Sequence, residues 1–272
     1  MELSFGAFLH VGFLRNALMA GILVGALCGI VGTLVVVNRL LFLSGSIAHA
    51  SYGGVGIALF LGFSPVLGAG MFAVFSAVVM GVLSLRSRER VDVAIGVIWA
   101  AGMSVGIIFS TLAPGYKGGL MGYLFGSILA VPSGDLVMML VLLVVVLLLL
   151  FFFYKEVLAF SFDREHAEVV GVPVTTFYLL ILVVVALVVM LSIRVVGLIL
   201  VIALLSIPPA IAERFSCHFS LVMLVAALLG MAFCLVGLVA SWVLNVHAGA
   251  AIVLVATVSY GISLLLTERA GA

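Results

Sequence analysis

The sequence predicts an all-α, polytopic membrane helix bundle of about eight or nine transmembrane helices, organised as one domain over residues 1–272. Two observations predict this fold class. Hydrophobic residues make up 67% of the chain and charged residues 8%, whereas soluble domains are roughly 25% charged. Apolar segments of about 20 residues, the length that a bilayer requires, also follow one another with only short polar connections. We therefore expect no soluble catalytic domain in these residues.

The apolar run from Leu136 to Tyr154 is long enough to cross a bilayer by itself. The first span carries Gly21, Gly25 and Gly29, and small residues at this spacing let membrane helices approach closely, so we expect an interior helix there. The second and seventh spans are short, which leaves eight spans as the alternative to nine. In order, the predicted spans are residues 16–38, 47–62, 65–85, 92–112, 136–154, 174–191, 195–213, 220–243 and 247–266.

The basic residues predict the orientation of the chain. With nine spans and an outer N-terminus, the inner side carries Arg39, Arg86, Arg88, Arg90, Lys155, Arg164, Arg214 and Arg269, and the outer side keeps Arg15, Lys117 and Arg194. This asymmetry follows the positive-inside rule. We therefore expect a multi-pass protein with the N-terminus outside and the C-terminus in the cytoplasm.

The second span places a histidine among small residues, between Gly45 and Gly54. An ionisable side chain at membrane depth is costly, and by default it indicates a functional site. Residues three or four apart share a helix face, so Ser46 and Tyr52 lie beside His49. These residues leave two interpretations open: a functional histidine, or one that hydrogen-bonds a carbonyl of a neighbouring helix.

The apolar segment from Leu120 to Val131 is too short to cross a bilayer. Gly118, Gly122 and Gly126 would give such a segment a small-residue face for close packing. We interpret it as an external re-entrant segment, and a plain surface loop is the alternative.

The longest polar stretch runs from Lys155 to Pro173. Asp163 is a suitable helix N-cap, Glu165 places an acid in the first turn, and Gly171 before Pro173 is a typical stop. The pattern predicts a short amphipathic cytoplasmic helix. Such a helix either docks on another protein or only solvates the membrane edge.

In their order and spacing, these stretches resemble the membrane permease of bacterial ABC importers for zinc, manganese or iron. The resemblance covers nearly the whole chain, and no single motif in it is strong. It rests on Gly45 to Ile57, Tyr123 to Val131, Phe162 to Ala167 with Gly171 to Pro173, Val196 to Leu200, Ile207 to Ala210 and Ala250 to Leu254.

The resemblance implies a transport permease of the bacterial inner membrane rather than an enzyme. It implies a second copy of the chain, a separate cytoplasmic ATP-binding cassette ATPase and an extracytoplasmic metal-binding protein as partners, alongside the lipid bilayer. No permanently bound cofactor is implied, because the metal is the cargo. The net charge of +1 gives no indication of a nucleic-acid partner.

The same resemblance assigns roles to two of the stretches. The polar helix becomes the coupling helix that contacts the ATPase, with Phe162, Asp163, Glu165, Ala167, Glu168 and Gly171 as its candidate residues. His49 matches a family histidine on the metal path, with Ser46 and Tyr52 as weak neighbours. The family usually has an aspartate four residues before that histidine, where this chain has Gly45.

A metal site without that carboxylate should hold a cation loosely, as a transit point requires. Imidazole suits zinc, copper, iron and nickel, and manganese prefers oxygen ligands. We therefore expect zinc, with manganese or iron as alternatives. His247, where the family usually has proline, is a second candidate ligand on the outer side, unless it is only an exposed interfacial histidine.

Glu213, Arg214, Cys217 and His218 form a further cluster of metal-ligand residue types. Their place in an inner loop after Pro208 and Pro209 favours a surface or ATPase contact over a metal site. Two other functions stay open. A secondary transporter without an ATPase should carry intramembrane carboxylates or an internal repeat. An intramembrane hydrolase should carry a His-Glu-x-x-His helix or a nucleophile in a Gly-x-Ser-x-Gly turn. The first motif is absent, and Gly102 to Gly106 match the second only within the predicted span 92–112 and not in a turn.

Overall fold

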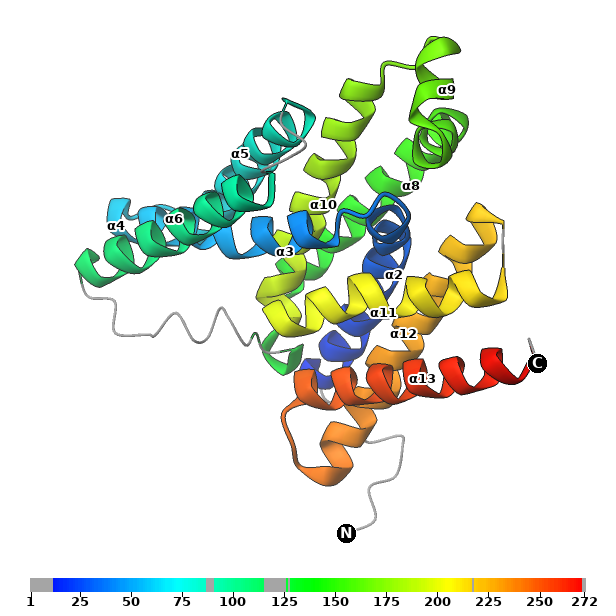
Figure 1. Ribbon diagram of the computed structural model, residues 1–272. Helices are drawn as coiled ribbons and strands as arrows, with labels where there is room; N and C mark the ends of the chain where they lie inside the picture. Colours follow the sequence, from blue (N-terminus) through cyan, green and yellow to red (C-terminus); the bar gives the residue numbers. More distant parts are fainter. Residues whose placement is uncertain (1–11, 87–90, 115–125, 127, 217, 271–272) are drawn as a thin grey trace. The chain divides into compact units, whose positions relative to one another are not determined.

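The computed structural model describes residues 12–86, 91–114, 126, 128–216 and 218–270, and every regular element within these ranges is helical (Figure 1). Eight of the described helices are long and apolar enough to cross a membrane. The all-α polytopic fold class is thereby confirmed. The elements are α2 (Gly12–Val37), α3 (Leu41–Ala50), α4 (Tyr52–Leu61), α5 (Pro65–Arg86), α6 (Val91–Leu112), η1 (Ile128–Ala130), α8 (Ser133–Phe162), α9 (Arg164–Val169), α10 (Val174–Val196), α11 (Leu198–Phe215), α12 (Phe219–Leu244) and α13 (Ala248–Ala270).

The structure differs from the prediction at the second expected span. In place of one span over residues 47–62, it has α3 and α4, each of 10 residues, which meet at Ser51. Neither helix reaches the length of a span, so the ninth span is not confirmed. Glycine and serine are weak helix formers, and Gly53 and Gly54 follow Tyr52 in the first turn of α4. The predicted re-entrant segment from Leu120 to Val131 lies mostly outside the described residues.

The chain folds into two compact units. Unit 1 comprises Met1–Val36, Phe125–Val145 and Ser192–Ala272, and unit 2 comprises Val37–Leu124 and Val146–Leu191. Helices α8 and α10 contribute to both units. Helix α8 departs from helical geometry at Phe153, where φ is −115° and ψ is 25°.

Unit 1 is built around a close approach of α2 and α12. A Cβ atom at Gly25 would lie 2.6 Å from the backbone of Gly230, and one at Gly29 would lie 2.5 Å from the backbone of Ala226. The two helices therefore run antiparallel with their backbones in contact. This geometry confirms the prediction of a tightly packed interior helix, because only glycine permits such proximity.

Unit 2 holds α3 to α6, α9 and most of α10. Helix α5 lies against α10 where Gly81 faces the side chains of Leu179 and Leu182. The Tyr178 hydroxyl of α10 donates to Ser84 Oγ of α5 at 3.0 Å, which fixes the register of the pair.

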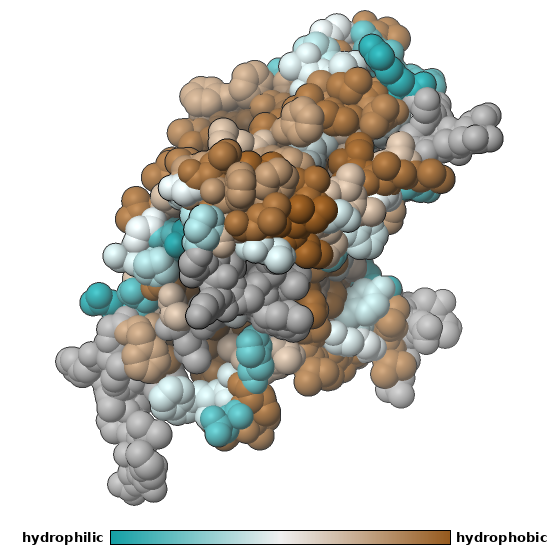
Figure 2. Space-filling model, turned by 90° about the vertical axis from the view of Figure 1, so that its left-hand side faces the viewer, coloured by the Kyte–Doolittle hydropathy of each residue, from teal (hydrophilic) through white to brown (hydrophobic). Residues whose placement is uncertain are grey.

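Hydrophobic side chains cover much of the face shown in Figure 2, and hydrophilic ones form small separate patches. Helix α8 illustrates the pattern, because Val137, Val141, Val144, Leu148 and Phe151 along it are all exposed. A helix that exposes a continuous apolar row is stable in lipid, where burial of that row against protein brings no hydrophobic advantage.

Candidate functional site

The His49 region begins at a sharp turn between α2 and α3. Arg39 has a φ of 56°, in the left-handed region that non-glycine residues seldom adopt. After this turn α3 carries its serines inward. Ser46 is buried, and its hydroxyl donates to the Phe42 carbonyl at 2.9 Å. At the junction with α4, the buried Ser51 hydroxyl donates to the Ala48 carbonyl at 2.6 Å.

Glycines hold α4 against two neighbours. A Cβ atom at Gly54 would meet the backbone of Gly68 on α5, and one at Gly56 would meet Gly106 on α6. At the junction, the Cβ of a residue replacing Gly102 would lie 2.8 Å from Cα of Ala50. Side chains of ordinary size would separate these helices, so the glycines fix the backbone around His49.

His49 lies near the end of α3, with its ring beside that of Trp99 on α6. The two ring centroids are 4.7 Å apart at an interplanar angle of 30°. The Trp99 indole N–H donates to the sulfur of Met103 at 3.1 Å, which orients the indole. His49 Nδ1 is buried and has no hydrogen-bond partner in the described part of the chain. A buried nitrogen without a hydrogen-bond partner lowers the stability of the folded protein by about 1–3 kcal/mol unless a ligand or water binds to it.

The structure brings Ser46 and His49 within one turn of α3 and places the buried Tyr52 at the start of α4. Their donor set is one imidazole and hydroxyl oxygens. No group of three or more histidine, cysteine, aspartate or glutamate side chains suitable for a metal occurs among the described residues. Such a set can guide a hydrated cation and cannot chelate it strongly.

Sequence reasoning missed Ser76 of α5. Its side chain is 1% exposed, and its hydroxyl is a further buried group without a hydrogen-bond partner in the described ranges. A single serine in an apolar span gives no signal in a sequence, because most such hydroxyls bond the preceding turn of their own helix.

His247 is exposed in the short link between α12 and α13. The link starts at Asn245, which ends α12 with a φ of 53°, and His247 then lies beside Gly249 at the start of α13. Among the described residues, His247 belongs to no group of three or more histidine, cysteine, aspartate or glutamate side chains that could hold a metal. Its role as an outer ligand stays a prediction.

The predicted polar helix is present as α9. Asp163 is its N-cap, and its carboxylate accepts from the His166 backbone N–H at 2.9 Å. At the other end Gly171 adopts a φ of 90°, and the Val172 N–H donates to the Ala167 carbonyl at 2.9 Å. The expected cap and stop are both confirmed, because each satisfies backbone groups that a helix end leaves free.

Helix α9 has one anchored side and one exposed side. Ala167 is fully buried, and the Arg164 guanidinium lies 4.8 Å from the Phe160 ring centroid and 5.2 Å from that of Tyr178. Phe162 and Val169 are 66% and 86% exposed. The exposed Glu165 and Glu168 complete this surface, hereafter the α9 face, which is defined by Phe162, Glu165, Glu168 and Val169.

The loop cluster after α11 does not form a metal group within the described residues. Arg214 instead lies over the Tyr260 ring of α13, with its guanidinium 5.3 Å from the ring centroid. His218 is exposed before α12, and Cys217 lies outside the described residues. This arrangement agrees with the surface interpretation.

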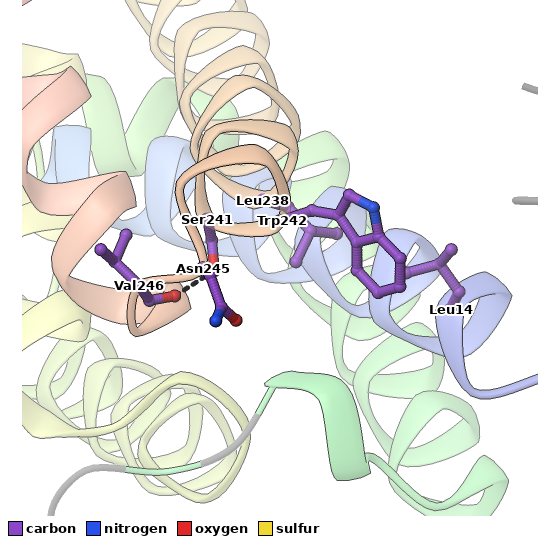
Figure 3. Close-up of a pocket in the computed structure, with 6 residues that line it drawn as sticks. All are labelled: Leu14, Leu238, Ser241, Trp242, Asn245 and Val246. Carbon is purple, nitrogen blue, oxygen red and sulfur yellow. Dashed lines mark hydrogen bonds between the residues drawn. The ribbon is translucent and has the colours of Figure 1, made fainter. Parts of the chain in front are cut away.

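A cavity of about 260 Å³ lies in unit 1, between α2 and the end of α12 (Figure 3). The Trp242 indole reaches toward Leu14, and the Ser241 hydroxyl donates to the Val246 carbonyl at 2.6 Å. The lining residues are Leu14, Leu238, Ser241, Trp242, Asn245 and Val246. None of them is an imidazole, thiol or carboxylate, so this cavity is not a transition-metal site.

The model of the ABC 3 transport family matches residues 10–267 of this chain. The chain belongs to the ABC 3 transport family. An uncharacterized membrane protein of Synechocystis is 45% identical to it, over 94% of this chain and 91% of the relative. The manganese transport system membrane protein MntC of Listeria innocua is 33% identical, over 97% of this chain and 94% of that protein.

A solved structure shows the same fold. The structure of PsaBC from Streptococcus pneumoniae in complex with a Fab contains a chain that is 31% identical, with a TM-score of 0.85 over 95% of this chain and 93% of that one. These similarities confirm the resemblance noted in the sequence. They also confirm a membrane transport permease rather than an enzyme.

Proposed function

We propose that this chain is the permease subunit of an ATP-driven importer that carries a divalent transition-metal ion across a bacterial inner membrane. The match of the ABC 3 transport family to residues 10–267 carries the proposal. The alternative of a secondary transporter predicts metal uptake that continues without ATP hydrolysis, and an intramembrane hydrolase predicts none.

Manganese is the first cargo to test and zinc the second. The imidazole of His49 favours zinc, as the sequence alone suggests. The other candidate groups, on Ser46 and Tyr52, are hydroxyl oxygens, which favour the harder manganese ion. The manganese transport protein of Listeria innocua, similar over nearly its whole length, supports the same choice.

The donor set around His49 suits a transit point. No carboxylate occurs among His49, Ser46 and Tyr52, so a divalent cation there keeps its full charge in surroundings of low dielectric. Binding is then weak, and a weakly bound ion leaves the site readily. His247 would serve on the outer side, because three candidate spans, α10, α11 and α12, separate it along the chain from the proposed cytoplasmic helix α9.

Helix α9 is proposed as the coupling helix that docks on the cytoplasmic ATPase. Arg164 and Ala167 fix its inner side to unit 2, so that a push on the α9 face is transmitted to α10 through Tyr178. Phe162 and Val169 offer apolar anchors, and Glu165 with Glu168 offers negative charge to a basic partner surface.

The complete importer would contain two copies of this permease, two ATPase subunits and an extracytoplasmic metal-binding protein. The test is reconstitution of these subunits in liposomes, with uptake of radioactive manganese, zinc and ferrous iron measured with ATP and with a non-hydrolysable analogue. We expect ATP-dependent uptake of at least one of the three metals. Equal uptake with the analogue would favour a secondary transporter, and no uptake of any of these metals would reject the proposal.

A further inference from the structure

Ser76 of α5 is an unusual serine in this protein. Its side chain is 1% exposed, and Oγ has no hydrogen-bond partner among the described residues. Buried polar groups are nearly always hydrogen-bonded, and an exception indicates a strained group, a functional group or a missing ligand.

Five other buried serines of this protein follow the ordinary rule. Their hydroxyls donate to a carbonyl three or four residues earlier, which satisfies them locally. The examples are Ser44 to Leu41, Ser46 to Phe42, Ser51 to Ala48, Ser110 to Ile107 and Ser263 to Tyr260. Ser76 does not make this bond, so neither the hydrogen nor the lone pairs of its hydroxyl have a partner among the described residues.

The register of α5 places Ser76 at the level of the His49 region. Gly68 approaches Gly54, and one turn later Phe72 approaches Gly53, so α5 runs antiparallel to α4 along this face. Ser76 follows one turn after Phe72 on the same face of α5. It therefore lies at the level of the end of α3, which packs against α5.

His49 Nδ1 is also buried and has no hydrogen-bond partner in the described ranges. We propose that Ser76 supplies an oxygen ligand to the transported metal opposite His49, and so replaces from a different helix the carboxylate that is absent at Gly45. This inference rests on the proposed function, and it adds α5 to the metal path.

A serine hydroxyl and a carboxylate bind a metal ion differently. A carboxylate would add negative charge and hold the ion, whereas a serine hydroxyl is a neutral oxygen that completes the shell of a partly hydrated cation. A path lined by an imidazole and hydroxyl groups favours metal ions that prefer oxygen ligands. It also releases the bound ion quickly.

The first experiment compares Ser76→Ala with Ser110→Ala in the reconstituted importer. Ser110 is also buried in unit 2, but its hydroxyl is satisfied by Ile107. If Ser76 is a ligand, Ser76→Ala lowers the apparent affinity for transported manganese by about tenfold, the effect of one lost polar contact. Ser110→Ala leaves that affinity unchanged. An unpaired hydroxyl with no role predicts unchanged uptake and slightly higher thermal stability for Ser76→Ala.

The second experiment uses Ser76→Cys, which keeps the size of the side chain and offers a softer sulfur ligand. We expect the ratio of zinc to manganese uptake to rise about tenfold, because thiolate ligands favour zinc. Manganese or zinc should also slow alkylation of the new thiol by a small water-soluble reagent, measured against the wild-type background of native cysteines.

The experiments distinguish failure of the proposed function from failure of the proposed role of Ser76. If the wild-type importer transports none of manganese, zinc and ferrous iron, the proposed function is wrong. If the wild type transports metal and both Ser76 variants keep its affinity and its metal ratio, only the role of Ser76 is rejected. Should Ser76→Ala not fold, the metal ratio of Ser76→Cys decides alone.

Discussion

The carboxylate of Asp135 lies 3.0 Å from the guanidinium of Arg194, and the pair joins the start of α8 to the end of α10 within unit 1. The Asp135 side chain is 8% exposed and that of Arg194 is 34% exposed. A carboxylate so deeply buried depends on its partner, because an uncompensated charge in these surroundings is costly.

Loss of Arg194 should therefore destabilise the protein more than loss of both partners. We expect Arg194→Ala to lower the free energy of unfolding by about 1–3 kcal/mol, since the partly exposed arginine leaves Asp135 some access to water. The double variant Asp135→Ala with Arg194→Ala should recover part of this loss. Unfolding in detergent is measured for Arg194→Ala, for the single variant Asp135→Ala and for the double variant, and additive effects of the two single variants would show that the pair contributes no coupling.

His49→Ala should lower metal uptake by about tenfold or more while the permease still assembles, because alanine is well tolerated in a helix and only the imidazole is removed. A histidine with only a packing role would behave differently, since its loss would reduce stability and leave transport by the folded protein intact. Uptake and thermal unfolding of the same preparation separate the two cases.

Gly45→Asp should restore a carboxylate one turn from His49 on α3. We expect a tighter two-ligand site, with a higher apparent metal affinity and a lower maximal rate because release slows. Uptake kinetics over a range of manganese concentrations give both values. Unchanged kinetics in a folded variant would place Gly45 away from the path.

Reversing the charge of the α9 face should uncouple transport from ATP hydrolysis. Glu165→Lys with Glu168→Lys is expected to abolish uptake while the permease stays inserted and folded, because both residues are exposed. The control variant is Glu156→Lys, because Glu156 lies on α8 before the α9 face and is not part of it. Wild-type coupling in the double variant would show that α9 is not the ATPase contact.

Two glycines of α6 should respond in opposite directions to the same substitution. A Cβ at Gly106 would lie 2.7 Å from the carbonyl carbon of Tyr52 and closer still to its oxygen, whereas a Cβ at Gly96 would meet nothing within 4 Å. Gly106→Ala should therefore cost about 1–3 kcal/mol through overpacking. Gly96→Ala should stabilise the helix by up to about 1 kcal/mol. Equal thermal stabilities for the two variants would contradict the close approach of α4 and α6.

Much of the fold follows from local sequence. Runs such as Leu136 to Tyr154 identify a membrane helix because lipid requires a continuous apolar segment of sufficient length. Asp163 and Gly171 predict the ends of α9, because a helix cap is formed by residues close in sequence. His49 is conspicuous for the same local reason, as an ionisable residue within an apolar span.

Other features of the structure are contacts between residues far apart in the chain. The hydropathy of the sequence does not predict these contacts. Asp135 finds Arg194, Gly25 meets Gly230, and Ser76 comes level with the end of α3 only when helices settle at particular registers. Apolar side chains are equally well solvated by lipid on every face, so hydropathy alone cannot select those registers. Close backbone packing selects them, and it thereby decides which polar atoms stay unpaired inside the protein.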